Sequence, residues 1–141
     1  MKIVCEGKTR EVSGGTSQEV YSTEETRIGT WIDGKPLYRM SFTGTSGAVK
    51  VKTVLVDLSV NDIETVTNLY GSLFRKDAYP AQVSINSQQE TWYIGTFYEE
   101  SDKSVSIIVS HTAFANRKVV GTIEYTKTTD QAAIQLDSPL F

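Results

Sequence analysis

Hydrophobic and polar residues alternate along most of the chain, with turn-forming residues between the alternating runs. In the C-terminal half, Val83 and Ile85 alternate with polar residues, and the same period of two recurs over 92–98, 105–109 and 119–125. Successive side chains of a β-strand point to opposite faces, so this period indicates strands. Over 92–98 both faces are apolar, which predicts a central strand. Runs at this spacing predict an all-β domain, an antiparallel β-sandwich or a jelly-roll-like domain.

The clearest local signal is the Asp33-Gly34 pair, which lies between two strand-like runs, 27–32 and 35–42. Asp-Gly supplies the positive φ values of a two-residue primed turn, so this segment predicts a β-hairpin. Pro36 has no N–H to donate, which predicts a hairpin at a sheet edge or with an irregularity there. The residues expected to share one face beyond the turn are Tyr38, Met40 and Phe42.

The stretch that follows changes phase part-way along. Val49 and Val51 share one parity, whereas Val54 and Val56 share the other. A change of phase near residues 52–53 indicates a β-bulge or a strand that passes from one sheet to another. Two strands separated by a turn would give the same pattern, so the alternatives stay open.

Residues 63–74 fit two secondary structures. Four apolar residues recur there at helical spacing, and Asn61 or Asp62 could cap such a helix. The β-branched run 65–67 and the interior Gly71 favour a strand instead. The pattern by itself does not decide between helix and strand.

Composition divides the chain into three parts. Residues 1–18 are predicted to form one short strand followed by a Gly/Ser-rich cluster, which is typical of a flexible connector or of a plain surface loop. Residues 19–130 carry the dense β pattern and are predicted to form the sandwich module. Residues 131–141 form a tail whose apolar residues predict docking on the domain or on a neighbouring subunit, although termini more commonly fray.

Charge and composition argue against several classes of function. The 14 Lys and Arg against 17 Asp and Glu give a net charge of −3, with no basic stripe. Nucleic acid rewards clustered cations, so it is not an expected partner. The single cysteine, Cys5, rules out an intrachain disulfide. The N-terminal apolar stretch is too short for a signal peptide. No window approaches the roughly 20 apolar residues of a membrane span, so membrane insertion is not expected.

No residue pattern supports a catalytic centre. His111 is the only imidazole and lies in a loop predicted to close a hairpin, where a solvated histidine is the ordinary interpretation and a recognition contact the alternative. Together with Cys5 it supplies too few ligands for a metal site. Glu99 and Glu100 are adjacent on the chain and would point to opposite faces, whereas glycosidases need facing carboxylates. We therefore predict no enzyme activity, no metal and no cofactor.

Aromatic residues are the one functional hint in the sequence. Their flat apolar faces and polar edges suit sugar rings if they are exposed, while packing in a core or a subunit interface is the more common role. The aromatic residues considered are Trp31, Tyr38, Trp92, Tyr93, Phe97 and Tyr98. The candidate ligand-binding residues are Trp31, Tyr38, Trp92, Tyr93, His111 and Arg117.

Two segments resemble a known group of proteins. Residues 19–39 read EVYSTEETRIGTWIDGKPLYR, and residues 121–130 read GTIEYTKTTD. They resemble the opening and the closing strand of a C-terminal module in tail-associated proteins of phages and prophages of Gram-positive and gut bacteria. The resemblance implies a β-rich module of a tail fibre, baseplate or receptor-binding protein. It also favours a strand for residues 63–74.

The resemblance further implies a homotrimer in the virion tail, or a prophage product that stays in the bacterial cytoplasm until release. Its partners would be other tail proteins and host cell-surface polysaccharide. We therefore expect a non-catalytic virion protein that is structural or binds a host receptor. The alternative is a carbohydrate-binding module that uses exposed aromatic residues.

Overall fold

The structure is a computed structural model, and it describes residues 20–132. The strand and connector predicted for 1–18, and all but the first two residues of the tail 131–141, lie outside the described residues. Within 20–132 the chain forms nine β-strands and no helix. The strands are β1 (Thr26–Thr30), β2 (Pro36–Thr45), β3 (Thr53–Asp57), β4 (Ile63–Arg75), β5 (Ala81–Ser84), β6 (Ser87–Gln89), β7 (Trp92–Glu99), β8 (Ser104–Val109) and β9 (Lys118–Lys127).

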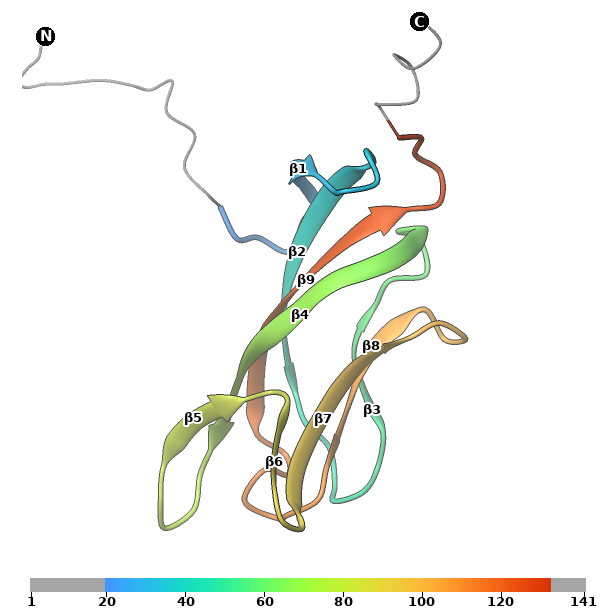
Figure 1. The fold of residues 1–141 in the computed structure, drawn as a ribbon. Helices are drawn as coiled ribbons and strands as arrows, with labels where there is room; N and C mark the ends of the chain where they lie inside the picture. Colours follow the sequence, from blue (N-terminus) through green and yellow to red (C-terminus); the bar gives the residue numbers. More distant parts are fainter. Residues whose placement is uncertain (1–19, 133–141) are drawn as a thin grey trace, which may run out of the picture.

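Two antiparallel sheets pack face to face (Figure 1). One has the order β1-β2-β9-β4-β5 and the other has the order β3-β8-β7-β6. The predicted all-β antiparallel sandwich is therefore confirmed. β7 lies between β6 and β8, as expected from its two apolar faces. In the described part of the chain, no helix could cross a membrane.

The space between the sheets is filled by two clusters of apolar side chains. One cluster lies around Ile94, Ile107 and Val119, and the other lies around Phe42, Ile123 and Tyr125. Phe42 pairs with Gly121 across β2 and β9, and a Cβ at Gly121 would lie 2.5 Å from the Cζ atom of Phe42. The missing side chain of this glycine thus makes room for the phenyl ring.

The Asp33-Gly34 hairpin is confirmed, but its turn differs from the prediction. β1 is an edge strand, as Pro36 indicated. The Gly34 N–H donates to the Trp31 carbonyl at 2.9 Å, and the Trp31 N–H donates to the Lys35 carbonyl at 2.8 Å. Of these turn residues only Gly34 has a positive φ, of 89°. The expected two-residue primed turn is therefore wrong, because a three-residue loop that ends in a left-handed glycine closes the hairpin.

Residues 63–75 form the long strand β4, as the resemblance suggested. Its helix-like spacing has a structural cause. The register against β9 shifts between Ile63 and Thr65 and again between Val66 and Asn68. Each register shift inserts one extra residue into β4, so Ile63 and Val66 pack on the same core cluster although they are three residues apart. The helix-like spacing does not continue beyond them on one face, because Tyr70 is exposed.

The change of phase in residues 48–58 also has a simple origin. Val49 and Val51 lie in the loop before β3, and β3 itself begins at Thr53. A register shift against β8 falls between Val54 and Val56. The phase therefore changes where this loop meets β3; the bulge considered at residues 52–53 is not found there, and the irregularity of β3 lies further along the strand.

The connections between strands gather at the two ends of the sandwich (Figure 1). We call one the terminal end, where the β1–β2 turn lies and residues 128–132 continue from β9. We call the other the distal end, which is formed by loops 46–52, 76–80, 90–91 and 110–117. Loop 110–117 joins β8 to β9, which belong to different sheets. The prediction that His111 closes a hairpin is therefore wrong, since its loop crosses between the sheets.

Candidate binding site at the distal end

Hydrogen bonds hold two of the distal loops, 46–52 and 110–117, against each other. The backbone N–H of Ser46 donates to the Arg117 carbonyl at 2.8 Å. The Ser46 hydroxyl accepts from the Arg117 N–H at 2.9 Å and donates to the Phe114 carbonyl at 2.5 Å. Because Ser46 is buried, these bonds are shielded from water. The loops are thus fixed before any ligand arrives, which lowers the entropic cost of binding.

Trp92, the first residue of β7, is enclosed by side chains from the distal end. The His111 imidazole stacks on its indole, with ring centroids 3.5 Å apart and planes 19° apart. Phe114 meets the indole edge-on at 5.9 Å, and the Arg75 guanidinium carbon lies 5.2 Å from its centroid. We call these four residues the distal aromatic cluster. Because His111 covers one face of the indole, that face is closed to a ligand.

Arg75 joins the distal aromatic cluster to the turn between β4 and β5. Its Nε and Nη2 atoms donate to the two carboxylate oxygens of Asp77 at 3.0 and 2.7 Å. This two-point bond lowers the pKa of Asp77, and the Tyr79 N–H contributes further. Asp77 therefore stays ionised and balances the guanidinium charge beside the aromatic rings.

A pocket of about 540 Å³, which we call the distal pocket, opens beside this cluster. Its walls come from the β6–β7 turn and from the two loops on either side of it, which are far apart in the sequence. The residues that line it are Lys50, Gln88, Glu90, Thr91, Trp92, Tyr93, Ser110 and His111. Charged groups of both signs and an aromatic ring thus face one space, a composition that suits a polar ligand with an apolar face.

The structure brings four of the six candidate residues together at the distal end. Trp92, Tyr93 and His111 line the distal pocket. Arg117 lies nearby, but its guanidinium is occupied, since it donates to the carbonyls of Ala113 at 3.3 Å and Lys76 at 2.7 Å. Arg117 therefore braces the loops around the pocket and does not line it.

The other two candidate residues, Trp31 and Tyr38, lie toward the terminal end. Trp31 is half-buried in the β1–β2 turn. The Tyr38 ring packs on Tyr125 with centroids 6.1 Å apart, and its hydroxyl donates to Asp130 at 2.7 Å. Tyr38 thus belongs to the core and to a hydrogen bond within the chain, and it is not part of the distal pocket.

Sequence reasoning missed several residues of the distal pocket. Lys50, Gln88, Glu90 and Ser110 are polar residues at loops and strand ends, where the pattern carries no signal for a shared site. Ser110 accepts from the Tyr93 N–H at 2.7 Å through its hydroxyl, so it also fixes the start of β7. Only the packing of the two sheets brings these residues together.

A second polar group lies at the terminal end, around Glu25. Its Oε1 atom accepts hydrogen bonds from the Tyr125 hydroxyl at 2.6 Å and from Asn61 Nδ2 at 3.2 Å. Its Oε2 atom lies 2.8 Å from Lys127 Nζ. Burial acts to raise the pKa of Glu25, but the hydrogen bonds from Lys127, Tyr125 and Asn61 outweigh it and lower the pKa overall.

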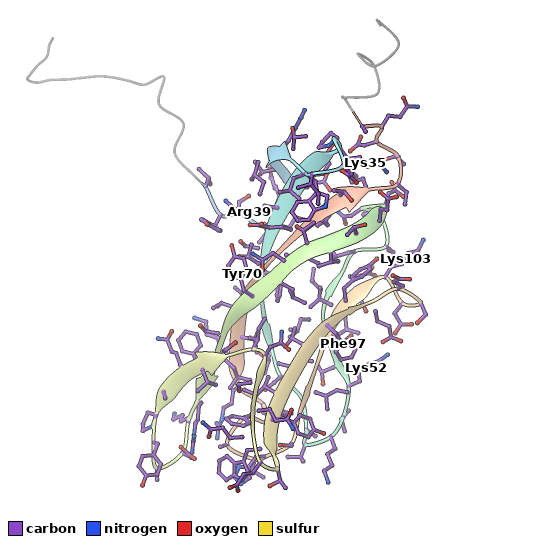
Figure 2. All side chains as sticks on the ribbon, in the orientation of Figure 1. Lys35, Arg39, Lys52, Tyr70, Phe97 and Lys103 are labelled. Atoms are coloured by element: carbon purple, nitrogen blue, oxygen red, sulfur yellow. The ribbon has the colours of Figure 1, made fainter. Side chains whose placement is uncertain are left out.

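Glu99, one of the two adjacent carboxylates considered for catalysis, belongs to an ion-pair cluster on the surface. Lys52, labelled in Figure 2, lies in the loop before β3. Its Nζ atom lies 2.6 Å from Glu99 and 2.9 Å from Asp102. The hydrogen bonds from Lys52 and Ser101 lower the pKa of Glu99. Among residues 20–132 no group of three or more His, Cys, Asp or Glu side chains is arranged to hold a metal ion.

Comparisons of the chain with protein-family models, curated proteins and solved structures gave no match.

Proposed function

We propose that this chain is a non-catalytic host-recognition module of a phage or prophage tail, which presents its distal end to the host cell surface. The observation that carries the proposal is that the end of β9 and the distal pocket lie at opposite ends of the sandwich. Residues 128–132 leave β9 at the terminal end, opposite the distal loops (Figure 1). The distal pocket opens among those loops. A module held at its terminal end keeps its distal loops free for a partner, which is where binding residues usually lie on a rigid scaffold.

The position of the two resembling segments supports the same proposal. The described part of the first segment, residues 20–39, lies beside residues 121–130, because β2 pairs with β9 and places Tyr38 opposite Tyr125. The hydrogen bond between Glu25 and Tyr125 joins them as well. The resemblance to tail modules therefore concerns one continuous structural unit and not two separate pieces.

We further propose that the module assembles as a homotrimer. The edge strand β3 and the loop before it expose Val54 and Val51, each at 52%. Exposed apolar residues on a sheet edge form a surface that a neighbouring subunit would cover. In the proposed trimer, a neighbouring copy of the chain would cover this edge.

The proposal is tested by the mass of the full chain in solution and by its binding to intact Gram-positive and gut bacterial cells. We expect a trimer mass in light scattering and saturable binding to the cells of at least one host. A monomer that binds no cells would contradict the proposal.

A carbohydrate-binding module that works outside a virion is the second candidate. The distal pocket favours it, because Tyr93 and the side chain of Gln88 present an aromatic face and an amide to the same space. A monomer that captures purified cell-wall polysaccharide would support this second function over the first.

A further inference from the structure

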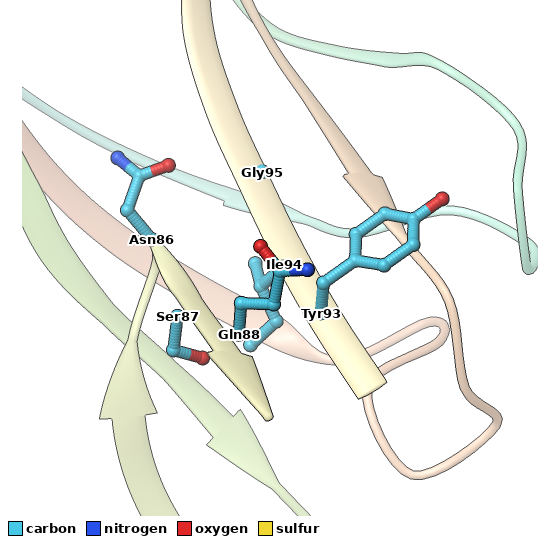
Figure 3. Close-up of a pocket in the computed structure, with 6 residues that line it drawn as sticks. All are labelled: Asn86, Ser87, Gln88, Tyr93, Ile94 and Gly95. Carbon is cyan, nitrogen blue, oxygen red and sulfur yellow. The ribbon is translucent and has the colours of Figure 1, made fainter. Parts of the chain in front are cut away.

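The row of side chains on the outer face of β7 is interrupted at Gly95. Ile94 and Thr96 point inward and are buried, so Tyr93, Gly95 and Phe97 occupy the outer face. A hollow of about 550 Å³, which we call the Gly95 hollow, opens there (Figure 3). A Cβ at Gly95 would meet no atom within 4 Å, so the backbone at this point is uncovered.

The lining of the Gly95 hollow is polar but uncharged. It consists of Asn86, Ser87, Gln88, Tyr93, Ile94 and Gly95. The Asn86 side-chain oxygen accepts a hydrogen bond from the Thr96 N–H at 3.0 Å, which fixes this amide and leaves its NH₂ group to point away from that bond. Within residues 20–132 the side-chain amide of Gln88 makes no hydrogen bond. The hollow therefore offers amide donors and acceptors together with a tyrosine ring.

This lining selects the chemistry of a ligand. An ion would find no opposite charge among the six lining residues, and a purely apolar group would leave the amides without partners. An uncharged ring with several hydroxyl groups and one apolar face satisfies both the amides and the aromatic side chain. Because Gly95 has no side chain, such a ring can approach the strand backbone closely. Tyr93 lies two residues away on the same face, at about 6.6 Å along the strand, so its ring is within reach of the same ligand.

The Gly95 hollow adjoins the distal pocket. Gln88 and Tyr93 line both of them. These two residues are paired across β6 and β7, and Figure 3 shows their side chains. A ligand with one ring over Gly95 can therefore continue past Tyr93 toward Lys50 and His111 in the distal pocket.

We propose that the Gly95 hollow binds an uncharged sugar ring of an oligosaccharide that continues past Tyr93 into the distal pocket. This proposal rests on the proposed function, since the oligosaccharide would be part of a host surface polysaccharide. It adds the class of ligand and the residues that hold it.

Two glycine variants test the proposal with little risk to the fold. Gly95→Val fills the hollow, and valine is a good strand residue for which the structure has space. Gly29→Val is the matched control, because a Cβ at Gly29 also meets nothing within 4 Å and β1 lies at the other end of the sandwich. Both variants and the unaltered chain are applied to an array of neutral and anionic oligosaccharides, with thermal unfolding as a check of folding.

We expect the unaltered chain to bind neutral oligosaccharides and Gly95→Val to bind them roughly tenfold or more weakly, as when a pocket no longer accommodates its ligand. Gly29→Val should bind within about twofold of the unaltered chain. If Gly95→Val does not fold, Gln88→Ala replaces it, since Gln88 is an exposed residue of the edge strand β6 whose side chain makes no hydrogen bond within residues 20–132. Gln88→Ala should weaken binding about fivefold through the lost hydrogen bonds.

The outcomes separate this proposal from the proposed function. Failure to bind any neutral oligosaccharide, or equal binding by a folded Gly95→Val variant, would overturn the sugar site. If host cells are still bound in either case, the recognition module stands and its ligand lies elsewhere. If neutral oligosaccharides are bound and Gly95→Val abolishes this, the sugar site stands even when no bacterial cell is recognised.

Discussion

The Tyr125 hydroxyl donates a 2.6 Å hydrogen bond to Glu25, a residue 100 positions earlier in the chain. Tyr125 is fully buried, and burial followed by the contact with Glu25 raises its pKa far above the usual range. The tyrosine therefore remains a hydrogen-bond donor at every accessible pH, and the charge of the pair resides on Glu25. This bond fastens the segment before β1 to the centre of the five-stranded sheet.

Glu25→Gln should lower the free energy of unfolding at pH 7 by about 1–3 kcal/mol, because it removes the charged acceptor shared by Tyr125 and Lys127. The side chains of Glu25 and Lys127 are only 23% and 18% exposed, so solvent screens this pair weakly. The effect should depend on pH with a definite sign. The pKa of Glu25 in the folded chain lies below its ordinary value of 4.5, so its contribution is complete above that pH. It is lost as the pH falls through the lowered pKa.

Denaturant unfolding of Glu25→Gln and of the unaltered chain between pH 7 and pH 2 measures this difference. The gap between them should narrow only below about pH 4.5. Glu24→Gln is the control, since Glu24 is exposed and its carboxylate makes no contact in the described chain; we expect a change within about 0.5 kcal/mol. A gap that is constant down to pH 2 would contradict the role of the Glu25 charge.

Gly121→Ala should destabilise the sandwich by about 1–3 kcal/mol, because the added methyl group would lie 2.5 Å from the Phe42 ring in a packed core. Thermal or denaturant unfolding gives the magnitude. Gly29→Ala is the matched control, since its methyl group meets no atom within 4 Å and should change stability by no more than about 0.5 kcal/mol. Equal stabilities of the two variants would show that Phe42 does not occupy the space over Gly121.

Thr126→Val should leave stability unchanged or raise it by up to about 1 kcal/mol. The Thr126 hydroxyl is buried and has no hydrogen-bond partner among the described residues. It therefore loses its hydration on folding without gaining a hydrogen bond, and valine removes this unfavourable contribution. Thr96→Val provides the opposite case, because the Thr96 hydroxyl is buried and donates to the Ile85 carbonyl at 2.9 Å. We expect it to cost about 1–2 kcal/mol in unfolding experiments. A loss of similar size in both variants would indicate that Thr126 has a partner.

His111→Ala should expose the indole of Trp92 and shift its fluorescence to longer wavelength, because the imidazole that stacks at 3.5 Å is removed. A loss of about 0.5–1.5 kcal/mol in stability should accompany the shift. The measurement is made with Trp31→Phe in both proteins, so that Trp92 is the only tryptophan. An unchanged emission spectrum would contradict the stacked arrangement.

The sequence by itself determined where several of the strands lie, because a period of two marks an extended backbone. The runs 92–98, 105–109 and 119–125 each lie within a strand of the structure. The Asp33-Gly34 hairpin was equally clear, although its turn holds one positive φ and not two. These are local properties, since the direction of each side chain follows from backbone geometry alone.

Only the tertiary structure decided the features that depend on pairing between distant strands. Two register shifts against β9 turn Ile63, Val66 and Leu69 to one side, which gives this part of β4 the three-residue spacing that is also typical of a helix. The distal pocket likewise unites Lys50 with Gln88 and His111, which lie on three separate segments. Alternation within one segment says which face a residue occupies, but it does not say which other segment that face meets, because the stacking of two sheets sets those contacts.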